Sequence, residues 1–141
     1  MKGLRDKVAV ITGGGGGIGA AICRRFGEEG TAVAVLDLNG KAAEEVAGEI
    51  RAAGGKAKAY PVDLTVQEQV QATVAAVEND LGPIDILVNN AGWDRAAPFL
   101  KTDKALWDKI VAVNLYGPLY MHHAVLSRMA ARGKGRVVNI A

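Results

Sequence analysis

Five consecutive glycines, Gly13–Gly17, separate a short apolar run from the start of a helical pattern. The run Lys7–Thr12, rich in Val and Ile, is typical of a buried strand, and apolar residues from Ile18 to Phe26 recur at helical spacing. Because glycine has no Cβ, the N–H groups of such a turn can approach an anion closely, and a helix N-terminus adds free N–H groups. The order of strand, glycine turn and helix therefore predicts a phosphate-binding turn.

Apolar runs of strand length alternate with helical patterns along the rest of the chain. The expected strands cover Lys7–Thr12, Ala32–Asp37, Ala57–Val62, Ile84–Val88 and Arg136–Ile140. The expected helices run from Ile18 to Gly30, from Lys41 to Ala53, from Val66 to Leu81, and from a Thr102 cap to about Met129 with a kink at Gly117 and Pro118. Because each connection is long enough for a crossover helix, the order predicts an α/β fold with a parallel sheet covered on both faces.

The composition suits a folded chain in a reducing compartment. Its 141 residues are 50% hydrophobic and 23% charged, which is enough for one domain with a buried core. Seventeen Lys and Arg against 15 Asp and Glu leave a net charge of +2 without a run of like charge, so no nucleic-acid partner is indicated. Cys23 is the only cysteine, and no apolar stretch approaches the roughly 20 residues that span a bilayer. We therefore expect a soluble cytoplasmic protein with no membrane anchor.

The glycine run fits two nucleotide-binding registers. Gly14, Gly16 and Gly19 match G-x-G-x-x-G, a match that adjacent glycines make easy. The more informative match is T-G-x-x-x-G-x-G, formed by Thr12, Gly13, Gly17 and Gly19. A nucleoside-triphosphate loop would need Lys and then Ser or Thr after its last glycine, but two alanines follow Gly19. The pattern therefore favours a dinucleotide, and a flexible surface loop is the alternative.

Asp37 ends the second expected strand, 18 residues after Gly19. A carboxylate at that place can accept hydrogen bonds from both hydroxyls of an adenosine ribose and repels a 2′-phosphate. A charge-assisted hydrogen bond is worth roughly 1.5–3 kcal/mol, which corresponds to on the order of a ten- to hundredfold preference for NAD over NADP. No Lys or Arg lies in the glycine run to hold a phosphate. An Asp that only closes a turn is the alternative.

Four motifs occur in order along the chain: Thr12–Gly19, Val62-Asp63-Leu64, Asn89-Asn90-Ala91-Gly92 and Val113-Asn114. Together they resemble the motifs of short-chain dehydrogenases/reductases, and the resemblance runs through all 141 residues. It implies the N-terminal five-strand portion of a Rossmann-type doubly wound sheet, with strand order 3-2-1-4-5 and NAD as the cofactor.

The resemblance also implies a role for each motif residue. The implied cofactor-binding residues are Thr12, Gly13, Gly17, Ile18, Gly19, Asp37, Leu38, Asp63, Leu64, Asn90, Ala91 and Gly92. Asn114 would belong to the catalytic set, where the family uses this residue to bend the helix and hold a proton-relaying water. Independently, Asn114 is a polar residue in an apolar helical stretch, which predicts a buried amide with hydrogen-bond partners. A surface-facing Asn is the alternative.

The family's acid–base chemistry needs a Ser and a Tyr with a Lys four residues later, and the chain does not contain that pair. None of Tyr60, Tyr116 and Tyr120 has a Lys at this spacing. The family's Ser follows the fifth strand, at about the place where the sequence ends. We therefore expect residues 1–141 to be the NAD-binding portion of a longer single-domain enzyme and inactive alone. A non-catalytic NAD-binding module is the alternative from another class.

The stretch from Asn89 to Phe99 and the sequence MHHAVL at 121–126 are similar to 2-hydroxycyclohexanecarboxyl-CoA dehydrogenases of this family. This resemblance implies oxidation of an alicyclic β-hydroxyacyl-CoA with NAD, that is, hydride transfer between a secondary alcohol or ketone and the nicotinamide. Trp93 would then wall the substrate pocket, or only pack in its loop. A 3-oxoacyl-carrier-protein or 3-oxoacyl-CoA reductase is the alternative, although such reductases commonly use NADPH and Asp37 weighs against that.

Three remaining features lead to further expectations. Adjacent helical residues such as His122 and His123 point about 100° apart, so we expect no metal site there. Cys23 lies on the first helix and is expected to pack in the core. The long last helix is apolar on more than one face, and the face turned away from the sheet resembles the family's dimer surface. We therefore expect a homo-oligomer, a dimer or tetramer, for the full-length enzyme, and aggregation or marginal stability for the chain alone.

Overall fold

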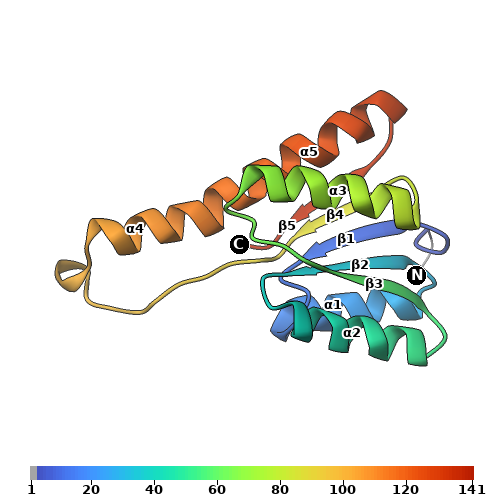
Figure 1. Ribbon diagram of the computed structural model, residues 1–141, viewed down its shortest axis with the longest axis horizontal. Helices are drawn as coiled ribbons and strands as arrows, with labels where there is room; N and C mark the ends of the chain where they lie inside the picture. The colour runs from blue at the N-terminus through green and yellow to red at the C-terminus, as the bar shows by residue number, and fades with distance from the viewer. Residues whose placement is uncertain (1–2) are drawn as a thin grey trace.

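The computed structural model describes residues 3–141, and these form a parallel sheet between two layers of helices (Figure 1). The strands are β1 (Val8–Thr12), β2 (Ala32–Asp37), β3 (Lys56–Pro61), β4 (Ile86–Asn89) and β5 (Arg136–Asn139). All neighbouring pairs are parallel, and the order is β3-β2-β1-β4-β5. The α/β class and the strand order expected from the sequence are therefore confirmed.

Four helices cover the two faces of the sheet (Figure 1). Helices α1 (Gly17–Glu28) and α2 (Gly40–Ala52) cover one face, and α3 (Gln67–Leu81) and α5 (Gly117–Arg132) cover the other. Successive strand residues alternate between the two cores, so Val10 packs with the α3–α5 layer and Ile11 packs with the α1–α2 layer. No helix between residues 3 and 141 combines the length and hydropathy that crossing a bilayer requires.

Strand β4 begins two residues later than the apolar run suggested. Ile84 and Asp85 precede it, and the Asp85 carboxylate accepts a hydrogen bond from the Val8 N–H at 3.0 Å. The side chain thus takes the place that a strand neighbour would have at the start of β1. The other strand boundaries differ from the expected ones by one residue at most.

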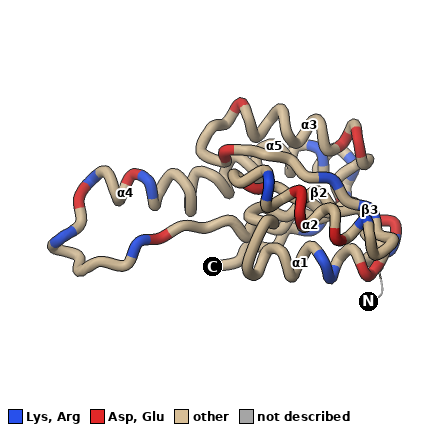
Figure 2. The backbone as a smooth tube through the Cα atoms, turned by 60° about the horizontal axis from the view of Figure 1, so that its bottom comes forward, with Lys and Arg blue, Asp and Glu red and all other residues tan. Residues whose placement is uncertain are grey.

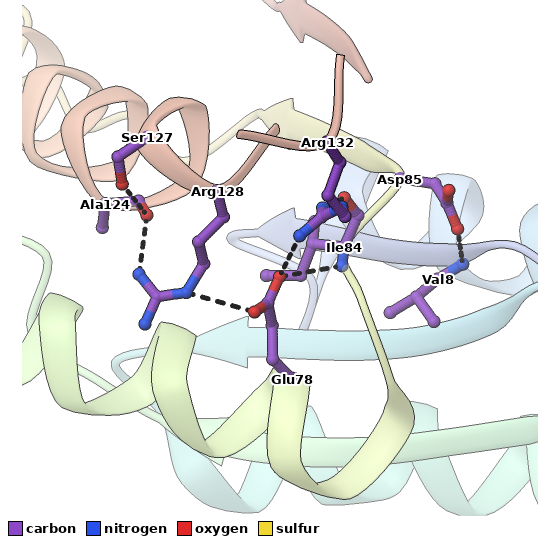
Figure 3. A network of polar contacts seen from close by, with 8 residues as sticks. All are labelled: Val8, Glu78, Ile84, Asp85, Ala124, Ser127, Arg128 and Arg132. Atoms are coloured by element: carbon purple, nitrogen blue, oxygen red, sulfur yellow. Dashed lines mark hydrogen bonds and ion pairs between the residues drawn. The ribbon is translucent and has the colours of Figure 1, made fainter. Parts of the chain in front are cut away.

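A polar network joins α3, α5 and the entry to β4 (Figure 3). One oxygen of Glu78 accepts hydrogen bonds from the Ile84 N–H and from Arg132, each at 3.1 Å. Its other oxygen pairs with Arg128 Nε at 3.2 Å, and Arg132 also donates to the Ile84 carbonyl at 2.5 Å. One carboxylate therefore fixes two turns of α5 against α3 and positions the chain that enters the sheet.

The helix that follows the β4 loop starts with a different cap from the expected one. Thr102 was expected to cap it, but Asp103 does so, because its carboxylate accepts a hydrogen bond from the Leu106 N–H at 3.0 Å. Thr102 instead follows a short 3-10 turn, Phe99–Lys101, where its hydroxyl donates to the Phe99 carbonyl and accepts from Trp107 Nε1. The helix, α4, therefore covers Lys104–Val111.

Helix α4 and the preceding loop project beyond the sheet as an arm, residues 90–116 (Figure 1). Acidic and basic positions are interspersed along this arm (Figure 2). Between α4 and α5 the backbone makes a π-helical turn, Ala112–Tyr116, in which the Gly117 N–H donates to the Ala112 carbonyl. The irregularity thus precedes the expected kink at Gly117 and Pro118. Because Pro118 has no N–H, the carbonyl four residues earlier lacks its helical partner, which favours a wider turn there.

Candidate functional site

A cleft of about 600 Å³ lies at the carboxyl ends of β1, β2 and β4. From β1 the chain crosses first to β2 and β3 on one side and then to β4 and β5 on the other, so the cleft lies where the strand order reverses. Most of the residues expected at the site line it, namely Gly13, Ile18, Asp37, Leu38, Asp63, Leu64, Asn90, Ala91, Gly92 and Trp93. Thr12, Gly17, Gly19 and Asn114 are not in the lining.

Several positions of the glycine turn require glycine, either because φ is positive or because a Cβ would clash. Gly17 has φ +51°, and a Cβ on Gly19 would lie 2.1 Å from the Gly13 carbonyl oxygen. Gly16, the residue before α1, has no side chain that could cap the helix. The first N–H groups of α1 can therefore donate to another acceptor. These features fit the register T-G-x-x-x-G-x-G and can bind an anionic group.

Thr12 joins the glycine turn to the loop that follows β4. Its buried hydroxyl oxygen accepts hydrogen bonds from the N–H groups of Asn90 and Ala91, both at 3.0 Å. The Asn90 amide donates back to the carbonyls of Thr12, at 3.1 Å, and Gly13, at 3.3 Å. Thr12 is 1% exposed, so it lies beneath the cleft and supports the residues that line it.

Asp37 is held at the end of β2 by two backbone donors. Its Oδ2 accepts a hydrogen bond from the Gly15 N–H and its Oδ1 accepts one from the Asn39 N–H, both at 2.9 Å. Asn39 in turn caps α2 by accepting from the Ala42 N–H at 3.1 Å. The carboxylate is half-buried and lines the cleft beside Leu38, which is 75% exposed. Negative charge is therefore fixed at this end of the cleft.

Asp63 and Leu64 form the next stretch of the wall. Asp63 Oδ1 accepts hydrogen bonds from the N–H of Thr65, at 2.9 Å, and from its hydroxyl, at 2.6 Å. Leu64 packs partly against the core, and a Cβ on Gly117 would lie 3.3 Å from its Cβ. This turn is therefore held from both sides, by its own side chains and by the start of α5.

Asn114 binds the loop after β4 from the π-helical turn. Its Oδ1 accepts from the Trp93 N–H at 3.1 Å, and its Nδ2 donates to the Trp93 carbonyl at 2.6 Å and the Ile110 carbonyl at 2.9 Å. The expectation of a buried amide is wrong, because Asn114 is exposed, although its hydrogen-bond partners are present. The Lys109 ammonium lies over the Trp93 ring, 3.8 Å from the ring centre, in a cation–π contact. Both residues line the cleft. Lys109 was not expected, since a lone Lys on a helix gives no signal.

A family model for short chain dehydrogenases matches residues 7–141. The chain belongs to the short-chain dehydrogenase family. Within this family it is 42% identical to "Nodulation protein G" of Azospirillum brasilense and 40% identical to "D-threitol dehydrogenase" of Mycolicibacterium smegmatis, each over 98% of the chain. It covers 56% of the first protein and 53% of the second, so it spans about half the length of the curated relatives that it matches.

Two solved structures of oxidoreductases share the fold closely. An NAD⁺-bound xylitol dehydrogenase aligns with a TM-score of 0.93 at 39% identity, over 98% of this chain and 54% of that one. A metagenomic short-chain oxidoreductase in complex with NADP also aligns with a TM-score of 0.93, at 37% identity, over 98% of this chain and 63% of that one. Structural neighbours of this chain therefore hold either dinucleotide.

A polar cluster that the sequence did not predict lies where β4 and β5 end. The Asn89 amide nitrogen lies 3.1 Å from His122 Nε2 and donates to Asn139 Oδ1 at 3.0 Å, while Asn89 Oδ1 is buried without a partner among residues 3–141. Asn89 and Asn139 are paired neighbours on β4 and β5, a register that only the assembled sheet shows. His123 is exposed. Within residues 3–141, no group of three or more His, Cys, Asp or Glu side chains is placed to bind a metal ion.

Cys23 lies in the core, as expected. The side chain is fully buried with the α1–α2 layer, and burial raises the pKa of its thiol to about 12. The thiol therefore stays protonated at neutral pH, which suits a packing residue and not a nucleophile.

Proposed function

We propose that residues 1–141 bind NAD and form the nucleotide-binding portion of an NAD-dependent short-chain dehydrogenase. The full enzyme would transfer hydride between NAD(H) and a secondary alcohol or ketone. The observation that carries the proposal is the fixed carboxylate of Asp37, which stands in the cleft 18 residues after Gly19 with both oxygens anchored to backbone N–H groups. Bound NAD would supply the hydride acceptor.

Each part of such a dinucleotide would contact a different segment of the cleft. The uncapped start of α1, with Gly17, Ile18 and Gly19, would hold the pyrophosphate, and Gly13 would let it approach. Asp37 and Leu38 would meet the adenosine ribose, and Asp63 and Leu64 would lie against the adenine. Asn90, Ala91 and Gly92 would pass beside the cofactor, supported from below by Thr12.

The preference for NAD over NADP rests on charge. Asp37 would repel a 2′-phosphate, and no Lys or Arg lies in Gly13–Gly19 to attract one. The cleft does contain a cation, Lys109, but it lies over Trp93. Because Trp93 belongs to the loop after β4 and Asp37 ends β2, Lys109 would meet the substrate and not the adenosine ribose.

For the substrate, we propose an alicyclic β-hydroxyacyl-CoA. The support is the resemblance of residues 89–99 and 121–126 to enzymes that oxidise such thioesters, together with Trp93 and Lys109, which offer an apolar wall and a positive charge. A polyol is the second candidate, because relatives at about 40% identity carry the names D-threitol dehydrogenase and xylitol dehydrogenase.

Hydride transfer also needs an acid–base pair, and residues 1–141 contain no Tyr with a Lys four residues later. We propose that Asn114 belongs to the catalytic set of the full enzyme. Its two hydrogen bonds to the Trp93 backbone would fix the loop beside the cofactor. The chain by itself should therefore bind NAD without turning over any alcohol.

Calorimetric titration of residues 1–141 with NAD and NADP tests the binding proposal. We expect NAD to bind on the order of ten- to a hundredfold more tightly than NADP. Failure to bind either dinucleotide would contradict the proposal. For the substrate, the longest protein that the coding sequence yields would be assayed with NAD and an alicyclic hydroxyacyl-CoA, threitol or xylitol, and turnover of a polyol alone would favour the second candidate.

A further inference from the structure

The Asp37 carboxylate is oriented by the glycine turn and not only by its own strand. Gly15, in the middle of the turn, donates its N–H to Oδ2 at 2.9 Å, while the Asn39 N–H donates to Oδ1 at 2.9 Å. The two donors come from segments on opposite sides of the carboxylate in the sequence. Together they fix both the position and the rotation of the carboxylate plane.

The two backbone bonds leave acceptor capacity on each oxygen. A carboxylate has about four lone-pair sites, so with one site used on each oxygen, one remains on each. Two vicinal hydroxyl groups are a ligand that can donate to both at once, as the 2′- and 3′-hydroxyls of a ribose would. A phosphate ester at the 2′ position has no proton to donate and brings negative charge against the same oxygens.

Gly15 can hold this position only because it has no side chain. A Cβ there would lie 2.9 Å from Asp37 Oδ2, 3.0 Å from the Ala42 Cβ and 3.0 Å from the Ala43 nitrogen. The Ala43 nitrogen belongs to the first turn of α2, which cannot give way as a flexible side chain could. The Asp37 carboxylate is the neighbour that can move, so a methyl group on Gly15 would displace it.

We propose that Gly15 is a specificity-determining positioning residue, which selects an unphosphorylated adenosine ribose by holding the Asp37 carboxylate. The inference rests on the proposed NAD site and adds a second residue to its selectivity. Gly15 acts through Asp37. Its substitution should therefore change the ratio of the NADP and NAD dissociation constants, whereas general damage to the turn would weaken both cofactors equally.

The test compares both dissociation constants in residues 1–141 and in the Gly15→Ala variant by titration calorimetry. We expect Gly15→Ala to lower the NADP-to-NAD ratio about tenfold, mainly through weaker NAD binding. The matched control is Gly48→Ala on α2, where a Cβ meets only the flexible end of Arg51 at 3.8 Å. It should leave the ratio within about twofold of the parent value.

Coupling between the two residues gives the second readout. In the Asp37→Asn background, which lacks the charge, Gly15→Ala should cause no further change in the ratio. Equal weakening of NAD and NADP by Gly15→Ala, or an undiminished effect in the Asp37→Asn background, would overturn the inference. Loss of binding by the parent chain would instead refute the proposed function itself.

If Gly15→Ala does not fold, Asp37→Glu tests the same point without a change in the turn. The longer side chain keeps the charge but cannot keep both backbone bonds and the same oxygen positions. We expect a loss of selectivity of about tenfold. Full selectivity in Asp37→Glu would show that charge alone suffices and would overturn the role of Gly15.

Discussion

The Thr12 hydroxyl shows how one residue can shape the site without facing the cleft. It accepts from two N–H groups, of Asn90 and Ala91, that lie 78 and 79 residues further along the chain. A buried donor without an acceptor costs roughly 1–3 kcal/mol, so the hydroxyl stabilises the closure of the β4 loop onto the glycine turn. One hydroxyl oxygen therefore joins two motifs that are far apart in the sequence.

The buried thiol of Cys23 predicts a loss of stability in alkali. Its folded pKa of about 12 lies above the unfolded value near 9, so the thiol stabilises the fold fully below pH 9. This contribution is lost as the pH rises from 9 towards 12, because the unfolded chain releases the proton first. At pH 10.5 the free energy of unfolding should fall by about 2 kcal/mol from this group. Urea denaturation at pH 8 and pH 10.5 measures the change.

The Cys23→Ala variant shows how much of the alkaline loss in the free energy of unfolding comes from the thiol. Burial also raises the pKa of Tyr60, whose hydroxyl donates to Asp80 at 2.8 Å, so a second group weakens the fold in the same pH range. Cys23→Ala should therefore still lose stability in alkali, but less than the parent chain, whatever its stability at pH 8. An equal loss in both proteins would contradict the expected role of the thiol.

At the scale of elements, the strands and most helices follow from local patterns. Buried strands such as β1 and β2 are continuous apolar runs, and glycines mark the ends of α1 and α2, so these elements could be predicted. The cap at Asp103 was missed because Thr102 has a similar propensity, and only the path of the chain chooses between neighbours. The π-helical turn was missed because a period of 3.6 residues carries no sign of a single wide turn.

The candidate site, like the helices and strands, could be predicted where local sequence signals define it. Glycine spacing and the distance to Asp37 are local signals, and both lead to the cleft. The contacts of Asn114 with Trp93 and the cluster of His122 with Asn89 depend on how distant segments meet, which no spacing encodes. Asn114 was expected to be buried because its sequence neighbours are apolar, but those neighbours lie on an arm that the described residues leave uncovered.

The junction of α3, α5 and β4 should depend on Glu78. In Glu78→Ala, the Ile84 N–H and both arginines lose the carboxylate that they share, while helix propensity changes little between Glu and Ala. We expect the free energy of unfolding to fall by about 1–3 kcal/mol, measured by urea denaturation. Glu45→Ala on the exposed face of α2 is the matched control and should change it by less than about 0.5 kcal/mol. Equal effects of the two variants would show that the network adds nothing.

The whole molecule consists of a well-packed body and an arm that packs little. Between Phe99 and Tyr116 only Leu106 is buried, whereas the sheet and its four covering helices hold the rest of the core. One stripe of the arm and of α5 is apolar and open: Val111, Leu115 and Leu119, each four residues apart, are 42%, 53% and 48% exposed. Exposed apolar side chains at this spacing are typical of an interaction surface.

This stripe should make the chain self-associate. Two copies can bury it against each other, since helix faces of the same kind pack around a twofold axis. We expect sedimentation velocity to give a concentration-dependent mass above the 14.7 kDa of one chain. Substitution of Val111, Leu115 and Leu119 by Lys should shift the protein to monomer, because desolvating three ammonium groups opposes the contact. The control, Ala52→Lys with Ala131→Lys, adds charge at exposed positions elsewhere and should leave the mass distribution unchanged. A parent chain that stays monomeric at every concentration would contradict this prediction. The stripe would then be insufficient to pair two copies, and the homo-oligomer that we expect would require contacts beyond these three residues.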